Sequence, residues 1–408
     1  MTTELLLDPN ALADGGFISL GAFSISPDHQ RLAYSLDTSG EETYQLFVKA
    51  LADDSLIELP FADCDGSMTW ANESQTLFFG ELDETHRPHK LYRHTLGTDS
   101  ADLVFEEPDG RFFLSCYRSS SERQLIIHVG SKTTSEAWVL DAAAPHASFT
   151  CVAPREEGHE YDIDHGMLDG QWSWLIRSNQ PGINFALFSA SEAAPSRTHW
   201  QLLRAHEPQI MFEGFSLNQQ ALVLSLRENG LPIIEVQPQG QPAYRVQLPD
   251  AAYSLYVQDS LEFDSPAIRL RYEALNRPAQ VRQLTLATGE QSVLKQTPVL
   301  GDFDADRYVS QRLWATAADG SQVPISLVAK RDVLGSPAPL YLYMATAPTA
   351  KASTRGSPMH ASACLIAALS SPSPMCAAAV NWAKPGIAPA SRNTNTTPSA
   401  TSLPAPSS

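Results

Sequence analysis

Short runs of alternating hydrophobic and polar residues fill most of the chain up to Tyr343. Examples are RLAYSLD, QLFVKAL, QLIIHVG, EAWVLDA, ALVLSLRE and AIRLRYEA. The runs are rich in Val, Ile, Leu, Tyr and Phe, and Asp, Gly, Asn, Ser or Pro bound them. Such alternation is typical of strands that bury one face. No long segment of helical periodicity competes with it, so the sequence predicts a mainly β fold.

The predicted strands come in sets that resemble one another, with openings roughly 40 to 50 residues apart. The openings are AFSISPDHQRLAYSLD (from Ala22), SMTWANESQTLFFGELD (from Ser67), FLSCYRSSSERQLIIHVG (from Phe113), YDIDHGMLDGQWSWLIRSN (from Tyr161), FEGFSLNQQALVLSLREN (from Phe212) and YSLYVQDSLEFDSPAIRLRYEA (from Tyr253). A repeat of this length holding about four strands is typical of a β-propeller blade. A β-sandwich array is the alternative, but it needs longer units. The sequence therefore predicts about six blades.

The first residues, ELLLDPN, are expected to form the outer strand of a seventh blade whose remainder is missing. A blade cannot bury both of its faces alone, and a ring of blades must close or leave an exposed edge. We therefore expect residues 1–303 to form an incomplete seven-bladed propeller.

The pattern changes after the sixth set. RLWATA and VPISLVAK are expected to form a hairpin around Asp319 and Gly320, and the short apolar run PLYLY follows. A continuously apolar run fits a strand buried on both faces of an α/β sheet. A second domain is therefore predicted to begin near Val309, and we assign residues 304–343 to its start.

The charge and composition of the chain limit the partners that we expect it to bind. The 408 residues carry a net charge of −18, which disfavours nucleic acid because phosphate binding needs clustered Lys and Arg. An acidic surface suits a basic peptide or a small cation, although it also serves solubility alone. No stretch is long and apolar enough to predict a membrane span.

Five widely spaced cysteines, without a C-x-x-C motif, indicate reduced thiols. They are Cys64, Cys116, Cys151, Cys364 and Cys376. The first residues lack the basic and apolar regions of a signal peptide. Together these features predict a cytoplasmic protein.

Two polar clusters are candidates for chemistry. THRPHKLYRH contains His86, His89 and His94, but no Cys or Asp at ligand spacing, so a loop or blade surface is favoured over a metal site. The Ser-rich YRSSSER is expected to be a turn between strands rather than a nucleophile. No Gly-rich phosphate loop is present.

The second cluster is HEYDIDH. It contains His159, Glu160, Asp162, Asp164 and His165. In a strand, the two aspartates would share a face as a carboxylate pair. A turn at the edge of a blade is favoured over that arrangement.

Several of these segments together resemble the oligopeptidase B group of the prolyl oligopeptidase family of serine peptidases. The resemblance rests on SLGAFSISPDHQRLAYSLDTSGEETYQLFVKAL, YRSSSERQLIIHVGSKTTSEAWVLDA, GHEYDIDH and DGSQVPISLVAKRD followed by PLYLY. It extends from about Glu4 to Tyr343. It implies a seven-bladed propeller over an α/β-hydrolase domain, a Ser-His-Asp triad reached by short peptides, and cleavage after Arg or Lys.

The sequence departs from that family at the end of PLYLY. The family continues with a Y-G-Y-G turn that helps to hold the oxyanion, whereas this chain has Tyr343-Met344 and no G-x-S-x-G motif. By the same resemblance, we expect that about 100 residues preceding the second blade in the family have no counterpart in this sequence. We therefore assign no catalytic, cofactor-binding or metal-binding residue and expect no cofactor.

Residues 344–408 contain no Asp or Glu and consist mostly of Ala, Ser, Pro and Thr. We expect this low-complexity tail to be disordered. A linker is one interpretation of it. Out-of-frame translation is the other interpretation. It is tested by reading the third base of each codon together with the first two bases of the next codon as a new codon. In the new frame, every codon choice for Met344-Ala345 encodes Gly, and every choice for Asn381-Trp382 encodes Leu. Where several codons are possible, a permitted choice from Met344 onward encodes G-Y-G-A-Y-G-E. The family continues in this way, so we favour a frameshift.

The predicted identity is the propeller part of a truncated oligopeptidase B-like serine endopeptidase that is inactive by itself. Its expected partners are short peptides, preferably basic, with no nucleic acid and no membrane. The alternatives are a non-catalytic propeller that binds peptides or acts as a scaffold, and a non-functional pseudogene product.

Overall fold

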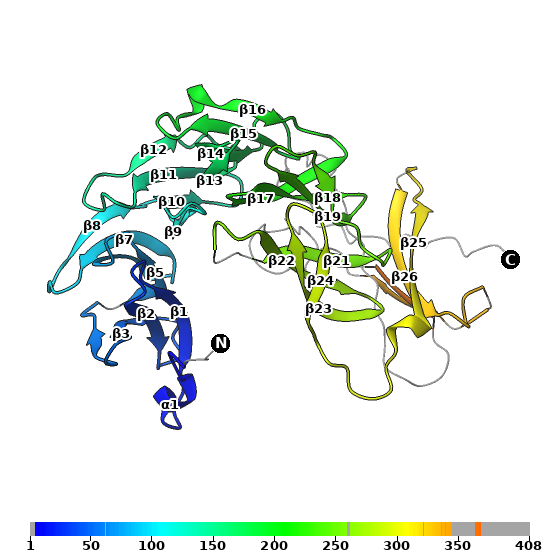
Figure 1. Ribbon diagram of the computed structural model, residues 1–408, viewed down its shortest axis with the longest axis horizontal. Helices are drawn as coiled ribbons and strands as arrows, with labels where there is room; N and C mark the ends of the chain where they lie inside the picture. The colour runs from blue at the N-terminus through cyan, green and yellow to red at the C-terminus, as the bar shows by residue number, and fades with distance from the viewer. Residues whose placement is uncertain are drawn as a thin grey trace, which may run out of the picture. The chain divides into compact units, whose positions relative to one another are not determined.

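The computed structural model describes residues 5–61, 63–258, 262–320, 322–335, 337–338, 340–344 and 364–368, the last two ranges as backbone only. The strands of these residues form seven four-stranded sheets (Figure 1). Six of the sheets have four strands in consecutive order. This confirms the predicted mainly β fold built from about six blades.

The chain divides into two compact units. The first contains Met1–Pro181, Ala186–Ala205 and Leu217–Gln219, and the second contains Gly182–Phe185, His206–Ser216 and Gln220–Ser408.

The first four sheets belong to the first unit, and their strands follow one another in chain order. The first two sheets contain β1 (Ser19–Ile25), β2 (Arg31–Asp37), β3 (Gln45–Ala50) and β4 (Leu56–Glu58), then β5 (Cys64–Trp70), β6 (Thr76–Leu82), β7 (Pro88–Thr95) and β8 (Ala101–Glu106). The third and fourth contain β9 (Phe113–Arg118), β10 (Gln124–Gly130), β11 (Ser135–Asp141) and β12 (Thr150–Ala153), then β13 (Tyr161–Leu168), β14 (Gln171–Ser178), β15 (Ala186–Ser191) and β16 (Gln201–Arg204). A short 3₁₀ helix, η1 (Arg197–His199), precedes β16.

Most of the fifth sheet and all of the sixth and seventh belong to the second unit. The fifth and sixth contain β17 (Ile210–Asn218), β18 (Ala221–Glu228), β19 (Leu231–Pro238) and β20 (Tyr244–Arg245), then β21 (Tyr253–Gln258), β22 (Ala267–Ala274), β23 (Arg277–Thr285) and β24 (Gln291–Gln296). After the 3₁₀ helix η2 (Ala305–Arg307), the seventh contains β25 (Tyr308–Thr316), β26 (Gln322–Lys330), β27 (Leu340–Met344) and β28 (Cys364–Ala368).

The seventh sheet has a different topology, with the order β25-β26-β28-β27 and a parallel pair, β26 with β28. Strands β25 and β26 form the predicted antiparallel hairpin, with Gly320 at a φ of 86° in its turn. Strand β28 lies in the segment that we expected to be disordered. Its residues, Cys-Leu-Ile-Ala-Ala, are a short apolar run, which suits a strand better than a linker. The rest of residues 345–408 lies outside the described residues.

One turn recurs between the first and second strands of the first three sheets. His29, Ser74 and Glu122 each adopt a φ between 57° and 61°, which is uncommon for residues other than Gly. In each turn the amide of that residue donates to the carbonyl of the third residue before it, as from His29 to Ser26 at 2.8 Å. The stretches SPDHQR, ANESQT and SSSERQ therefore fold alike, and the turn that we expected in YRSSSER is confirmed.

The N-terminal segment differs from the expected strand. Leu5–Asp8 lies outside any strand, and Pro9–Ala13 forms the helix α1. The Asp8 side chain caps α1 by accepting from the amides of Asn10 and Ala11, with Pro at the start of the helix. This capping sequence prevails over the apolar run before it, so the strand that we predicted over ELLLDPN is wrong for its described residues.

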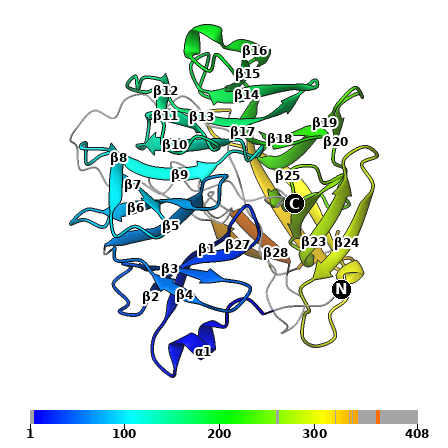
Figure 2. The ribbon, with the colours of Figure 1, turned by 60° about the vertical axis from the view of Figure 1, so that its left-hand side comes forward.

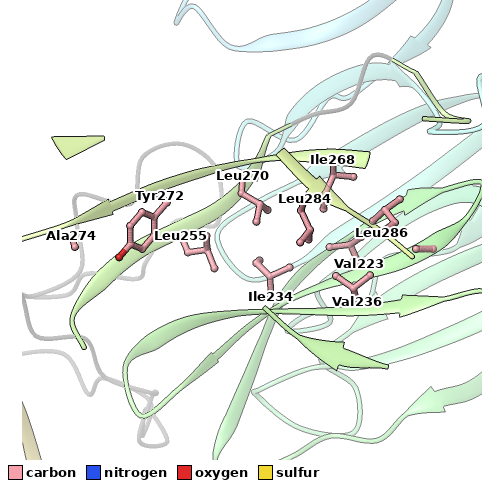
Figure 3. Close-up of a cluster of buried hydrophobic side chains, with 11 residues drawn as sticks. Val223, Ile234, Val236, Leu255, Ile268, Leu270, Tyr272, Ala274, Leu284 and Leu286 are labelled. Atoms are coloured by element: carbon pink, nitrogen blue, oxygen red, sulfur yellow. The ribbon is translucent and has the colours of Figure 1, made fainter. Parts of the chain in front are cut away.

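Buried side chains between consecutive sheets form the core of each unit. Trp70 lies between the first and second sheets, Ile127 between the second and third, and Trp174 between the third and fourth. In Figure 2 the strands of the second sheet, β5 to β8, follow one another in order. In the second unit, eleven buried residues join the fifth and sixth sheets, among them Val223 and Leu270 (Figure 3).

Candidate functional site

A polar connection joins the third sheet to the fourth. Asp164 and His165 lie on β13, Ser120 and Ser121 lie in the turn between β9 and β10, and Glu192 follows β15. We call these five residues the polar junction. The Asp164 carboxylate accepts from the amide of Ser120 at 2.8 Å and from the hydroxyl of Ser120. The amide of Ser121 donates to the His165 carbonyl at 3.0 Å, so side chains and backbone together connect the sheets.

Burial dominates the electrostatics of Asp164. Desolvation raises the pKa of its carboxyl from 3.8 to about 6. The hydrogen bonds from Ser120 and from the amide of His165 favour the ionised form and lower the pKa, but they offset only part of the desolvation. The carboxylate is therefore ionised near neutral pH and becomes protonated under mildly acidic conditions.

His165 has no exposed surface. Burial lowers the pKa of its imidazole from 6.5 to about 4, against the attraction of Glu192. Its ring stacks on Trp172, with the centroids 5.7 Å apart, and Arg123 lies 4.7 Å from the Trp172 ring centroid. The imidazole is therefore neutral at physiological pH and held in an aromatic environment.

The polar junction includes a serine, a histidine and a carboxylate in a row. Ser121 Oγ and His165 Nδ1 share a hydrogen bond of 2.7 Å, and His165 Nε2 lies 3.5 Å from Glu192 Oε1. A nucleophile, a base and an orienting carboxylate share this order in hydrolases. The imidazole here is inaccessible, and the Ser121 hydroxyl also contacts that of Ser119 at 2.9 Å. The arrangement can connect two sheets, but a substrate cannot reach its base.

The structure corrects the turn that we expected over HEYDIDH. Asp162, Asp164 and His165 lie within β13, and only His159 and Glu160 precede it. Asp162 accepts from Arg177 Nη1 at 2.7 Å on the neighbouring strand. The alternation YDIDH is that of a strand, which explains why the turn prediction was wrong.

His159 and Glu160 lie in the segment that connects β12 to β13. His159 is buried, shares a hydrogen bond of 2.8 Å with the Ser178 hydroxyl, and has its pKa lowered by burial. The amide of Glu160 donates to Asn179 Oδ1 at 2.9 Å. Neither side chain belongs to the polar junction.

The three histidines of THRPHKLYRH have separate environments. His86 lies in the turn before β7 with a φ of 58°, and His89 Nδ1 donates to the Glu81 carbonyl at 3.3 Å. His94 is buried and donates to the Ser100 carbonyl at 3.0 Å, so the predicted loop or surface position is wrong for this residue. Among the described side chains, no group of three or more His, Cys, Asp or Glu is arranged to hold a metal ion.

The thiols of Cys64, Cys116 and Cys151 are reduced and form no disulfide. Burial raises the pKa of the Cys64 and Cys116 thiols to about 12 and that of Cys151 to about 11. All three are protonated near neutral pH, and a thiol is a much weaker nucleophile than a thiolate. These cysteines therefore behave as core residues.

Three contributors to the polar junction escaped sequence analysis. Glu192 lies two strands after His165, and nothing in its neighbourhood marks it as a partner. Ser120 and Ser121 belong to the turn YRSSSER, whose only visible signal was its serine content. Within the part of the chain that the structure describes, we also find no helix of the length and apolarity needed to cross a membrane.

Consecutive four-stranded antiparallel sheets, joined by apolar clusters and recurrent turns, define this protein as a β-propeller domain. Residues 1–297 match the model of the prolyl oligopeptidase N-terminal beta-propeller domain. The chain belongs to the prolyl oligopeptidase family.

Two relatives support this assignment. Dipeptidyl aminopeptidase BI of Pseudoxanthomonas mexicana is 34% identical over 336 residues, which cover 81% of this chain and 46% of the relative. Protease 2 of Moraxella lacunata is 32% identical over 348 residues, which cover 84% of this chain and 49% of the relative. The chain thus spans about half the length of the curated relatives that it matches.

Solved structures agree with this result. Oligopeptidase B from Leishmania major superposes with a TM-score of 0.73 at 27% identity, covering 82% of this chain and 49% of that one. Oligopeptidase B from Trypanosoma brucei, solved with covalently bound antipain in a closed form, superposes with a TM-score of 0.72 at 27% identity and the same coverage. The resemblance to the oligopeptidase B group is therefore shown for the propeller part.

Proposed function

We propose that this chain is the propeller portion of an oligopeptidase B-like serine endopeptidase, and that it does not hydrolyse peptides by itself. One observation carries the proposal. The family match covers the blade sheets, whereas the sequence contains no G-x-S-x-G nucleophile motif. The polar junction offers no substitute, because its imidazole is fully buried.

The same proposal extends to the domain organisation. The propeller occupies residues 1–303, residues 304–343 begin an α/β-hydrolase domain, and residues 344–408 are translated out of frame. The hairpin β25–β26 and the strand β27 support a new sheet after the blades. The absence of Asp and Glu after Tyr343 supports the change of frame.

The proposed substrates of the complete enzyme are short peptides cleaved after Arg or Lys. The chain's net charge of −18 favours basic peptides over acidic ones. The free cysteines are compatible with the reduced, cytoplasmic environment that we propose.

A hydrolysis assay tests the proposal. The purified chain is incubated with a chromogenic peptide ending in Arg, with and without a serine-directed inhibitor. We expect no turnover above buffer. Turnover that the inhibitor abolishes would show that the chain is a peptidase as it stands.

Restoring the frame is the matched experiment. A gene that lacks the first two bases of the Met344 codon, and that is translated in the new frame beyond the codon of Ser408, encodes the family-like continuation. If the proposal is correct, this gene yields inhibitor-sensitive cleavage after Arg, while the original gene does not. Nucleotide sequencing around the codon of Tyr343 provides the direct check: codons that exclude the family-like reading would contradict the frameshift.

Peptide binding separates the proposal from a non-catalytic scaffold. We expect the chain to bind a labelled Arg-containing peptide weakly, because the catalytic half of the site is missing. Tight, saturable binding without hydrolysis would favour a scaffold. An insoluble chain without a cooperative melt would favour a non-functional product.

A further inference from the structure

Strand β22 presents two arginines to solvent on one face of the sixth sheet. Leu270 and Tyr272 of this strand are buried in the cluster that joins the sixth sheet to the fifth (Figure 3). Arg269 and Arg271 alternate with them and are exposed. Because successive side chains of a strand point to opposite faces, both guanidinium groups lie on the face that points away from the fifth sheet.

The ladders on both sides of β22 are regular at these two positions. The β21–β22 pairing shows no shift of register, and the shift in the β22–β23 pairing lies between Tyr272 and Ala274, beyond both arginines. The residues directly opposite the two arginines carry no charge; they are Tyr256 and Gln258 in β21 and Val281 and Gln283 in β23. The sheet therefore aligns two cations on one face and places no carboxylate opposite either of them.

The two arginines also lack an ionic partner elsewhere in the described part of the chain. Neither the Arg269 nor the Arg271 side chain forms a hydrogen bond or an ion pair with a described residue. Every other described arginine has at least one hydrogen bond, ion pair, ring contact or other electrostatic interaction. In a chain with a net charge of −18, two unpaired arginines side by side are a distinct feature.

We propose that Arg269 and Arg271 form a docking site for an acidic segment of a partner protein, bound in an extended conformation. Alternate residues of an antiparallel strand are about 7 Å apart. Two carboxylates at alternate positions of an extended ligand have the same spacing, so each can accept two parallel hydrogen bonds from one guanidinium group. The ligand is therefore a segment with the pattern acidic-x-acidic.

The chemistry of this face favours such a segment over other partners. An apolar partner would bury two charges without counter-charges, which is costly. A nucleic acid or a second copy of this chain carries many negative charges, which the net charge of −18 repels. A short segment with two carboxylates needs only the local attraction of the arginine pair. Tyr256 and Gln283 beside the pair offer further hydrogen-bond donors to it.

Fluorescence anisotropy with labelled peptides and the full chain tests the proposal. The probe has the core Thr-Glu-Val-Glu-Thr, whose Thr and Val residues favour an extended conformation. We expect saturable binding that added salt weakens. A peptide with the core Thr-Gln-Val-Gln-Thr should not bind measurably. One with the core Thr-Glu-Glu-Val-Thr should bind several-fold more weakly, because its carboxylates point to opposite sides of an extended chain.

Variants of the arginines locate the binding site. Arg269→Gln and Arg271→Gln should each raise the dissociation constant of the acidic peptide on the order of tenfold, because each removes a charge-assisted contact. Arg111→Gln is the matched control: it removes the same charge from a 74% exposed position that is already paired with Asp109, and it should leave the constant unchanged.

A charge reversal separates recognition from misfolding. The double variant Arg269→Glu and Arg271→Glu should lose the acidic peptide and bind a peptide with the core Thr-Lys-Val-Lys-Thr instead. Both positions are exposed, so its thermal melt should match that of the wild-type chain. A misfolded variant would lose binding without gaining the opposite preference.

Three results would overturn the proposal. The first is that the acidic peptide does not bind, or binds no better than the Gln peptide or the rearranged peptide. The second is that Arg271→Gln does not weaken binding more than Arg111→Gln does. The third is a dimer in sedimentation velocity that Arg271→Gln abolishes, which would assign this face to a second copy. The hydrolysis assay described above uses basic peptides, so its outcome does not depend on this proposal.

Discussion

Two connections between neighbouring sheets rely on different chemistry. The fifth and sixth sheets meet in an apolar cluster that includes Val223, Leu270 and Leu284, which we call the apolar junction (Figure 3). The third and fourth sheets also share an apolar cluster, but the polar junction adds a partly buried carboxylate and a buried imidazole to it. Apolar packing provides most of the stabilisation, but it is not directional and tolerates small shifts of one sheet against the next. Hydrogen bonds are directional and fix the alignment of the two sheets, but burying their polar groups costs desolvation energy.

The largest effect is expected at the apolar junction. Leu270 has no exposed surface, so Leu270→Ala removes buried methyl groups and leaves a cavity. Such changes lower the free energy of unfolding by about 2–5 kcal/mol. Urea unfolding followed by tryptophan fluorescence measures the loss. Leu313→Ala, at a 43% exposed position, should cost far less, and equal losses would contradict the contrast in burial.

His165→Gln tests the imidazole of the polar junction. Because folding lowers the pKa of His165 from 6.5 to about 4, the unfolded chain takes up the proton first. The imidazole therefore contributes stability that is present above pH 6.5 and lost as the pH falls toward 4. Relative to His165→Gln, the wild-type free energy of unfolding should fall by roughly 3 kcal/mol over this range. Parallel pH curves would show that His165 is not the titrating group.

Asp164→Asn tests the carboxyl, and the sign is opposite. Folding raises its pKa from 3.8 to about 6, so the folded chain takes up the proton first. Its contribution becomes more favourable as the pH falls through 6 toward 3.8. Between pH 7 and 4, the wild-type chain should gain up to about 3 kcal/mol relative to Asp164→Asn. The Asn amide can still bond Ser120, so this variant should fold, and its unfolding at pH 7 serves as the control.

A smaller effect is expected for Ser121→Ala. This change removes the hydrogen bond between the hydroxyl and His165 Nδ1, but leaves the amide bond from Ser121 to the His165 carbonyl. The loss should be about 1 kcal/mol in thermal or urea unfolding. The nearby exposed Glu122→Ala, in the same turn, provides a comparison. A loss as large as that of Leu270→Ala would mean that the hydroxyl has a greater role than one hydrogen bond.

The smallest effect is expected at a surface ion pair away from both junctions. Arg111 and Asp109 are 2.7 Å apart, but the Arg111 side chain is 74% exposed. Exposed pairs of this kind typically stabilise by at most about 1 kcal/mol. Arg111→Ala should therefore change the unfolding midpoint little, and added salt should reduce the difference further. A salt-independent loss of several kcal/mol in the free energy of unfolding would show that this ion pair stabilises the fold as strongly as buried groups do.

Sequence analysis predicted the repeating strands well because each strand carries its own signal. Alternating residues and polar turns located the six sheet openings, including Tyr161 and Tyr253 at the first residues of β13 and β21. The N-terminal segment was predicted wrongly, because three leucines suggested a strand where Asp8 and Pro9 start a helix. The tail was expected to be disordered, yet Cys364–Ala368 pairs with β26 and β27.

The polar junction could be predicted only in part. HEYDIDH stood out by composition, but whether its carboxylates met each other or other groups depended on neighbouring strands. The structure pairs Asp162 with Arg177 and Asp164 with Ser120. Each partner lies on a separate strand or turn, so no spacing within the motif indicated it.

The sequence by itself determined the class of this protein, because strand period, turn residues and repeat length are local properties written along the chain. It also led to the prediction that the family pattern ends at Tyr343. Only the tertiary structure decided which polar groups are buried together, because burial and its effect on pKa depend on segments brought from other strands. Asp164 and His165 of the polar junction gain their opposite pKa shifts, and the His165 imidazole loses its accessibility, through that packing.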